Sequence, residues 1–258
     1  MAPKPESLPQ LFDAVKAKFP ESLGPDRWYL VAASSLITNS NPTNFAQLWT
    51  YLTAQGEYQA LEKRQALNRR LREFLMKQWV TIGVPKSAVA LFSLIKEEKP
   101  GDADLSFTKY VALFLSAPLR PLRLKVNYRP SHAALTPANR ERGTQFLRYL
   151  YTEEQMEAMW KSWGKDSEWL TKEIVYGMFY GDDTVLGFVD TELITYTAIM
   201  CQGLQVTIHN HLGGLLGMGL SVEEIEGVTE CGELVAKWSG VDTSGWPDVR
   251  EIAAGLKK

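Results

Sequence analysis

This sequence of 258 residues contains little cysteine and no marked excess of charge of either sign. Its two cysteines, Cys201 and Cys231, form neither a CxxC pair nor a zinc-ligand spacing, and they are too few for a secreted disulfide framework. The 28 basic and 30 acidic side chains leave a net charge of −2, without the basic excess that is typical of nucleic-acid binding. We therefore expect no nucleic-acid partner.

Long apolar segments are also missing. The N-terminal residues MAPKPESLPQLF contain no apolar stretch of signal-peptide length. The longest uncharged run, residues 193–222, is interrupted by glutamines, histidines, an asparagine and several glycines, which are unfavourable in a lipid-spanning helix. We expect a soluble, cytoplasmic protein without a membrane partner.

No segment alternates apolar and polar residues over the length of a strand, whereas helical patterns are frequent. Residues 59–80 place apolar side chains at steps of three and four, which predicts a long amphipathic helix. Gly83 and Pro85 end that pattern, and residues 86–97 predict the next helix. The predicted fold class is all-α.

Capping residues mark helix starts in the second half of the chain. Thr152 with Gln155, and Ser221 with Glu224, have the spacing of a capping box. Two further N-cap candidates are Ser167 and Asp190.

Four prolines, at positions 118, 121, 130 and 137, interrupt the middle of the chain. We expect an irregular connection over residues 101–136, with one helix around residues 106–116. This connection divides the chain into an N-terminal helical unit, residues 1–100, and a C-terminal unit, residues 137–258. The C-terminal unit is expected to begin with Thr136 as an N-cap before Pro137.

The most informative polar residue is His211. On a helix from Leu204 to about Met218, it shares a face with Leu204, Ile208 and Leu215. An imidazole on an apolar face needs a hydrogen-bond partner, and burial favours its neutral, basic form. His209 lies a little over half a turn away, so the two histidines do not form a metal-binding pair on one face. We expect no metal and no other cofactor.

Glu192 is the natural partner, because it is the only charged residue in the segment 191–202. If it faces inward, it can orient His211 or share a proton with it, as a general acid–base site requires. A plainer interpretation exists for each residue. A histidine on an apolar face is more often a hydrogen-bonded core residue, and a first-turn glutamate gains from the helix dipole whatever else it does.

Residues 192–225 resemble the module shared by carboxymuconolactone decarboxylases and alkylhydroperoxidase D-like proteins. The resemblance rests on an acidic residue that opens a helix, a second helix with a histidine, and the pattern H-x7-G-[LA]-[ST]-x-E-E-[IV]. Glu192 and His211 have the nineteen-residue separation of the peroxidase branch. The histidine pattern here consists of His211, Gly219, Leu220, Ser221, Glu223, Glu224 and Ile225. The resemblance implies an all-α, alkylhydroperoxidase D-like fold with Glu192 and His211 at its polar centre.

The peroxidase branch also has a CxxC pair, whose two positions correspond here to Leu204 and Thr207. Neither side chain forms a thiolate, and Cys201 lies three residues before the first position without a resolving partner. The resemblance therefore favours the decarboxylase branch, which keeps the histidine without the cysteines. A redox protein that uses Cys201 is a less favoured alternative.

The first half contains a weaker version of the same pattern. Residues 69–97 also predict helix, turn and helix, with Glu73 as the counterpart of Glu192, but Phe92 stands where a histidine is expected. The whole chain thus resembles a two-repeat, fungal-type member of the family whose first repeat is degenerate. The resemblance implies a homo-oligomer, either a dimer or a trimer.

Several residues are candidates for contacts with a substrate. Tyr176, Tyr180 and Tyr196 supply hydroxyl groups, and the tryptophans at positions 160, 163 and 169 cluster near the first two. These aromatic residues form either an ordinary helix-packing core, which we favour, or the wall of a pocket for a flat apolar substrate. Arg69 and Arg70 are expected on a solvated face. The candidate substrate-binding residues are Tyr196, Tyr176, Tyr180, Arg72 and His209.

The favoured hypothesis is a cofactor-independent lyase or isomerase with His211 and Glu192 as catalytic residues. Its substrate would be a small apolar or aromatic metabolite, in fungal secondary metabolism if the family resemblance extends to its setting. The alternative from a different class is a non-catalytic, oligomeric binding or scaffold protein derived from the same fold.

Overall fold

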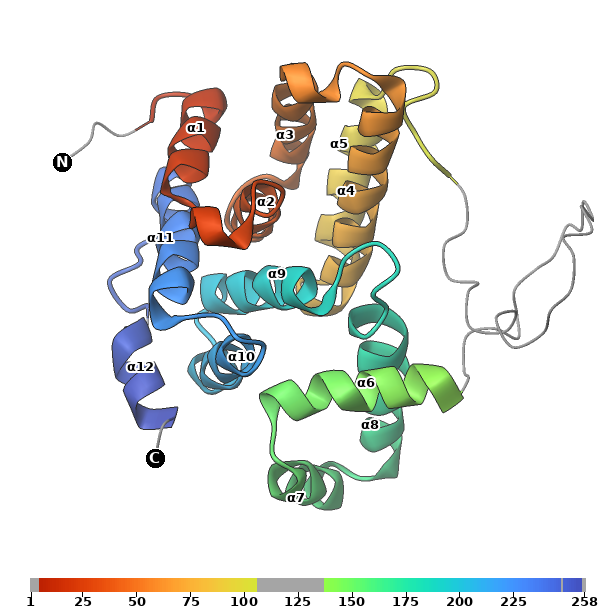
Figure 1. Cartoon of the computed structure of the whole chain (residues 1–258), viewed down its shortest axis with the longest axis vertical. Coiled ribbons are helices and arrows are strands. Elements are labelled where there is room, and N and C mark those ends of the chain that lie inside the picture. Colours follow the sequence, from red (N-terminus) through yellow and green to blue (C-terminus); the bar gives the residue numbers. More distant parts are fainter. Residues whose placement is uncertain (1–4, 106–136, 247, 257–258) are drawn as a thin grey trace, which may run out of the picture.

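The computed structural model describes residues 5–105, 137–246 and 248–256, and in these residues the protein is entirely helical, without a strand (Figure 1). The predicted all-α class is therefore confirmed. Most of the expected connection over residues 101–136, including its helix and the Thr136 cap, lies outside the described residues. Within the described part of the chain, no helix is both long enough and apolar enough to cross a bilayer.

The two helices predicted in the first half from their apolar patterns begin and end close to the expected residues. The long amphipathic pattern forms α4, and Gly83, with a φ of 89°, makes the turn into α5. The elements are α1 (Leu8–Lys18), η1 (Glu21–Leu23), α2 (Trp28–Asn39), η2 (Pro42–Asn44), α3 (Phe45–Thr53), η3 (Gly56–Tyr58), α4 (Leu61–Thr81) and α5 (Val84–Glu97).

Both predicted capping boxes form in the second half. The backbone N–H of Gln155 donates to Thr152 Oγ1 at 3.2 Å, and that of Glu224 donates to Ser221 Oγ at 3.1 Å. The elements are α6 (Pro137–Leu150), α7 (Glu153–Trp163), α8 (Lys165–Trp169), the π-helix η5 (Leu170–Tyr180), α9 (Phe188–Cys201), α10 (Gln205–Gly217), α11 (Val222–Trp238) and α12 (Val249–Leu256).

The two single N-cap predictions were wrong. Ser167 lies inside α8, because Gly164, with a φ of 86°, both ends α7 and caps α8. Asp190 lies in the first turn of α9, whose N-cap is Gly187. The carboxylate of Asp190 instead accepts a hydrogen bond from Arg27 Nε at 2.6 Å and so ties α9 to the start of α2.

Helix α9 occupies the centre of the molecule. In Figure 1 it runs between α2 and α4 on one side and α10 on the other, and it packs against all three. Eleven consecutive residues of α9, from Asp190 to Met200, are buried. One apolar core joins the two sequence units, since it contains Leu30 and Phe74 from the first unit and Leu193 and Ile225 from the second.

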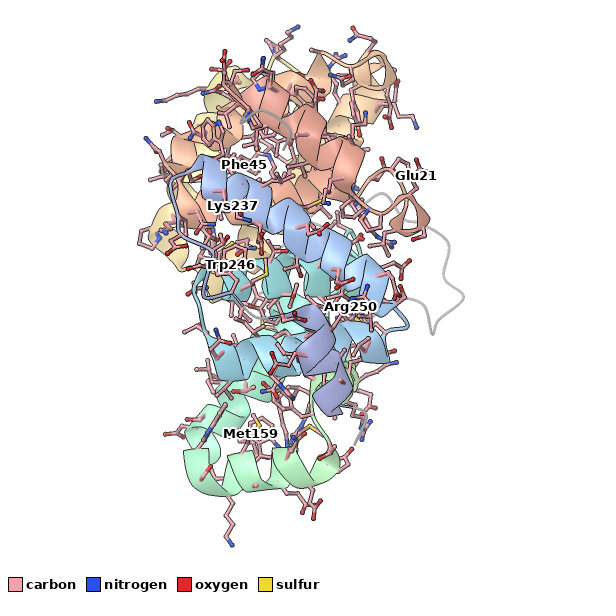
Figure 2. The ribbon with its side chains drawn as sticks, turned by 90° about the vertical axis from the view of Figure 1, so that its left-hand side faces the viewer. Glu21, Phe45, Met159, Lys237, Trp246 and Arg250 are labelled. Carbon is pink, nitrogen blue, oxygen red and sulfur yellow. The ribbon has the colours of Figure 1, made fainter. Side chains whose placement is uncertain are left out.

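A smaller apolar cluster lies between α6 and η5, and includes Phe146, Tyr176 and Tyr180. Glycines bring the two backbones together: a Cβ atom on Gly143 would lie 2.6 Å from the backbone nitrogen of Gly177. Helices α6, α7 and α8 form one end of the molecule (Figure 1). Figure 2 shows the same arrangement, with Phe45 of the large core and Met159 of the smaller cluster towards opposite ends of the molecule.

Candidate functional site

Glu192 and His211 meet in the interior of the protein. His211 Nδ1 lies 2.7 Å from Glu192 Oε1, and the two residues are 2% and 0% exposed. Gly203, with a φ of 68°, turns the chain between α9 and α10, so that residues nineteen positions apart face each other across the two packed helices. Ile208 and Leu215 share the buried face of α10 with His211, as predicted, but Leu204 is 47% exposed because the helix begins after it.

The contact between the two helices depends on Gly214. A Cβ atom at this position would lie 3.1 Å from Glu192 Oε1 and 2.3 Å from Leu150 Cδ2. A side chain here would therefore displace the Leu150 side chain and crowd the Glu192 carboxylate. Glycine at this position thus permits the close packing of α10 against Glu192 and Leu150.

Burial raises the pKa of Glu192 above its usual value, and the neighbouring His211 opposes that shift. The carboxyl group has one hydrogen bond, through Oε1, while Oε2 is buried and has no partner among the described residues. An acceptor without a partner in a low-dielectric interior is costly, so this oxygen lowers the stability of the fold.

Three tyrosines lie near this carboxyl group. Burial raises the pKa values of Tyr151, Tyr176 and Tyr180, and in each case the charge of Glu192 contributes further. Their hydroxyl groups therefore stay protonated at neutral pH and can act as hydrogen-bond donors. Tyr180 bonds to Thr81 Oγ1 at 2.6 Å, and Tyr151 interacts with both Tyr176 and Asn210.

The π-helix that carries Tyr176 and Tyr180 is held at its C-terminal end by a buried lysine from α4. Lys77 Nζ donates to the carbonyl oxygens of Phe179 at 2.7 Å and Asp182 at 2.8 Å. Glu73, the expected counterpart of Glu192, is 4% exposed and lies 3.7 Å from the same ammonium group. The first half of the chain thus also buries a glutamate, Glu73, but the charged group beside it is Lys77 of the same helix. Phe92, which stands where the histidine was sought, is 64% exposed.

A groove with a volume of about 780 Å³ opens beside the pair. Its floor and walls come from the end of α6, from α10 and from α12. The lining residues include Tyr149, Tyr151, Asn210, Gly213, Gly217 and Leu256. His211 lies behind this lining rather than in it, whereas the candidate substrate contact His209 is exposed and lines the groove.

Two other candidate substrate contacts are not brought to the pair. The hydroxyl of Tyr196 is 2.8 Å from Thr229 Oγ1 on α11, and burial raises its pKa to about 12. Arg72 Nη2 donates to the carboxylate of Glu98 at 2.7 Å, and its Nε donates to Asn68. Both side chains therefore already have partners in other parts of the fold.

The expectation for Arg70 was also wrong. Its Nε donates to the Tyr29 hydroxyl at 2.8 Å, and its guanidinium lies 3.5 Å from Asp190. Arg70 is a partly buried link between α2, α4 and α9 rather than part of a solvated face. Arg69 forms an ion pair with Asp104.

The tryptophans of the second half are divided between interior and surface. Trp160 is 9% exposed and belongs to the smaller apolar cluster, whereas Trp163 and Trp169 are 53% and 52% exposed. The core interpretation therefore applies to Trp160, Tyr176 and Tyr180. It does not apply to the other two tryptophans.

Cys201 lies in an environment that suppresses thiolate formation. Burial raises the pKa of its thiol to about 11, and its Sγ donates to Ser35 Oγ at 3.4 Å. A redox thiol needs the opposite shift. Among the described residues, no three His, Cys, Asp or Glu side chains converge closely enough to hold a metal ion.

Sequence reasoning missed two residues of this site. Tyr151 is half-buried between α6 and the Thr152 capping box, and its inward orientation depends on how α6 packs against η5. Asn210 lies next to His211 on α10 and faces the groove. Its position directly before His211 in the sequence was the one signal that could have identified it as a site residue.

Comparison of the chain with protein-family models, with curated proteins and with solved structures finds no match. The resemblance of residues 192–225 to the carboxymuconolactone decarboxylase-like module therefore stays a prediction.

Proposed function

We propose that the protein is a cofactor-independent acid–base enzyme of the lyase or isomerase type, with His211 as the proton acceptor and donor and Glu192 as its partner. The observation that carries this proposal is the buried 2.7 Å contact between His211 Nδ1 and Glu192 Oε1. A carboxylate that accepts the Nδ1 proton leaves the lone pair of Nε2 free to act as a base. No hydrogen bond to Nε2 is formed within the described part of the chain.

In this reaction, Nε2 removes a proton from the substrate, and the Glu192 carboxylate balances the charge of the resulting imidazolium. The imidazolium then returns the proton, either to another substrate atom, which gives an isomerisation, or to a departing hydroxide, which gives a dehydration. In a decarboxylation, Nε2 removes the proton of the substrate carboxyl group, carbon dioxide leaves with the bonding electrons remaining on carbon, and the imidazolium protonates this carbanion. The neutral tyrosine hydroxyls near Glu192 suit a small apolar or aromatic substrate with a polar group to hold.

The test is the transfer of solvent deuterium to carbon. The protein is incubated in D₂O with a mixed small-metabolite extract, and deuterium incorporation is read by mass spectrometry. We expect at least one metabolite to gain deuterium with the wild-type protein and about 100-fold more slowly with His211→Gln, the loss typical of a removed general base. Equal incorporation with both proteins would contradict the mechanism.

The broader family assignment is part of the proposal. The motif from Glu192 to Ile225 supports a two-repeat, fungal-type member of the carboxymuconolactone decarboxylase-like superfamily, with a cytoplasmic role in secondary metabolism. A homo-oligomer is supported by the outer face of α5, where Val89, Phe92 and Ile95 are 41%, 64% and 45% exposed. Light scattering of wild type and Phe92→Lys would measure the assembly and its dependence on this face.

One observation favours a second candidate, a non-catalytic binding or scaffold protein. His211 is only 2% exposed, as expected of a hydrogen-bonded core histidine. This candidate predicts that His211→Gln changes the stability of the protein and nothing else.

A further inference from the structure

The groove beside the pair has the dimensions and composition of a small-molecule site. Its volume of about 780 Å³ lies within the range of ligand pockets. Tyr149 and Tyr151 supply aromatic surface, and Leu216 and Leu256 supply aliphatic surface. On the α10 side the wall is flat, because Gly213 and Gly217 are one turn apart and have no side chains.

The charges at the groove are already paired. Among the described residues that line it, Arg148 alone is permanently charged; its Nε donates to Glu153 at 2.8 Å and its Nη1 lies 3.7 Å from Glu141. The other polar lining groups are neutral donors and acceptors, such as the amides of Asn210 and Gln155 and the hydroxyl of Tyr151. Among the described lining residues a phosphorylated ligand would therefore find no free cation, whereas a neutral ring with one polar group would find both stacking surface and hydrogen-bond partners.

Tyr151 belongs both to the groove and to the buried centre. It lines the groove, yet its side chain interacts with the fully buried Tyr176 and with Asn210, and the charge of Glu192 acts on it. A hydroxyl group donates one hydrogen bond and accepts up to two, so Tyr151 can bond a ligand and Tyr176 at the same time. Behind it, Glu192 Oε2 is buried without a partner among the described residues.

We propose that this groove is the ligand-binding site of the protein, that it takes a neutral aromatic compound with a hydroxyl or carbonyl group, and that Tyr151 bonds this polar group at the boundary between the groove and the buried centre. The role of Tyr151 towards Glu192 and His211 rests on the proposed acid–base function. Binding in the groove does not.

The experiment uses isothermal titration calorimetry of the full chain at pH 7 with two probes, 2-naphthol and 2-naphthyl phosphate. They share one ring system and differ in charge. We expect saturable binding of 2-naphthol at one site per chain, at least about tenfold tighter than that of the phosphate ester. Tenfold corresponds to about 1.4 kcal/mol.

Three variants locate the site. Gly217→Trp fills the groove, and its Cβ would lie no closer than 3.4 Å to a neighbour, the Tyr149 carbonyl oxygen. We expect it to weaken 2-naphthol binding by at least about tenfold, and Tyr151→Phe to weaken it about fivefold through the lost hydroxyl. Lys161→Trp, in the separate cavity between α7 and η5, is the matched control and should change binding less than about twofold.

Three results would overturn the proposal: no saturable binding of 2-naphthol, tighter binding of the phosphate ester, or unchanged binding in Gly217→Trp. If circular dichroism shows that Gly217→Trp is unfolded, Gly213→Leu narrows the same groove from the preceding turn of α10 and replaces it. Groove binding without His211-dependent deuterium transfer would contradict the acid–base function alone. His211-dependent deuterium transfer that is unchanged in the groove variants would contradict the groove proposal alone.

Discussion

Glu192 and Glu224 show how differently the fold treats two carboxyl groups of the same type. Burial raises the pKa of Glu192, whereas hydrogen bonds from Ser22 and the Ser221 backbone lower the pKa of Glu224. The folded protein therefore binds a proton at Glu192 more tightly than the unfolded chain does, and at Glu224 less tightly. Their effects on stability have opposite signs.

Glu192→Gln is expected to gain stability relative to wild type as the pH rises. The stabilisation from the Glu192 proton is fully present below the usual carboxyl pKa of 4.5 and is lost as the pH rises through the raised value. Glutamine cannot ionise, so it avoids this loss. Urea unfolding at pH 4 and pH 7 measures the difference in the free energy of unfolding between variant and wild type.

Glu224→Gln is the matched control with the opposite sign, because its carboxylate stabilises the fold above pH 4.5 and loses that effect as the pH falls. The free energy of unfolding of Glu224→Gln, minus that of wild type, should decrease from pH 4 to pH 7. If the stability of Glu192→Gln relative to wild type also decreases from pH 4 to pH 7, burial does not raise the pKa of Glu192.

The sequence predicted single residues well where spacing alone determines a contact. His211 and Glu192 meet because the residues between them form the rest of α9, a tight turn and the start of α10. Tyr196 was misplaced for a different reason. One helical turn puts it near Glu192, but the direction of its hydroxyl depends on Thr229 of α11, which no local pattern encodes.

At the scale of elements, α6 and η5 depend on backbone contact through glycine. Gly143→Ala would place a Cβ atom 2.6 Å from Gly177 N and 2.8 Å from the Lys172 carbonyl oxygen, so α6 must move away. We expect a loss of roughly 1–3 kcal/mol in the free energy of unfolding, the usual cost of overpacking. Chemical denaturation measures this loss. The tyrosines between the two helices should also change in near-ultraviolet circular dichroism.

Gly255→Ala serves as the comparison, since it is also a helical glycine and a Cβ atom there has no neighbour within 4 Å. It should leave the free energy of unfolding unchanged or raise it by up to about 1 kcal/mol through helix propensity. A Gly143→Ala protein as stable as Gly255→Ala would contradict the close packing of α6 on η5.

Helix starts were predictable where two side chains cooperate, as in the boxes at Thr152 and Ser221. The π-helix was not, because an apolar pattern at steps of three and four describes the α-helix and carries no sign of the wider i to i+5 hydrogen bonding. Ser167 was mistaken for a cap because an isolated serine, without a cooperating second side chain, does not by itself mark a helix start. Gly164 already separates α7 from α8 and caps α8, so Ser167 lies inside the helix.

For the whole molecule, the division into two sequence units does not extend to the core. Helix α2 of the first unit is buried along most of its length against α9 and α11 of the second. On the far side of the second unit, α12 is fastened to α11 by Arg250, which donates to Glu226 at 2.7 and 2.5 Å (Figure 2). Prolines in the sequence mark a boundary between segments, but they cannot show that the segments bury each other's apolar surface.

The two units are therefore expected to fold together. Residues 1–105 expressed alone would expose Leu30, Val31 and the rest of the α2 surface, and should remain unfolded. In the full chain, tryptophan fluorescence and far-ultraviolet circular dichroism should report one coincident unfolding transition. A dispersed proton–nitrogen NMR spectrum of the fragment would contradict a shared core.

The central claim is that Glu192 holds the Nδ1 proton of His211 and leaves Nε2 as a base. Nitrogen-15 NMR of the histidine ring at pH 7 tests it most directly, because the two ring nitrogens differ in chemical shift when one carries the proton. We predict that His211 is the Nδ1–H tautomer in wild type, with a deshielded Nδ1 proton that is absent in Glu192→Gln. A ring protonated on Nε2 with a bare Nδ1, unchanged in Glu192→Gln, would contradict the account.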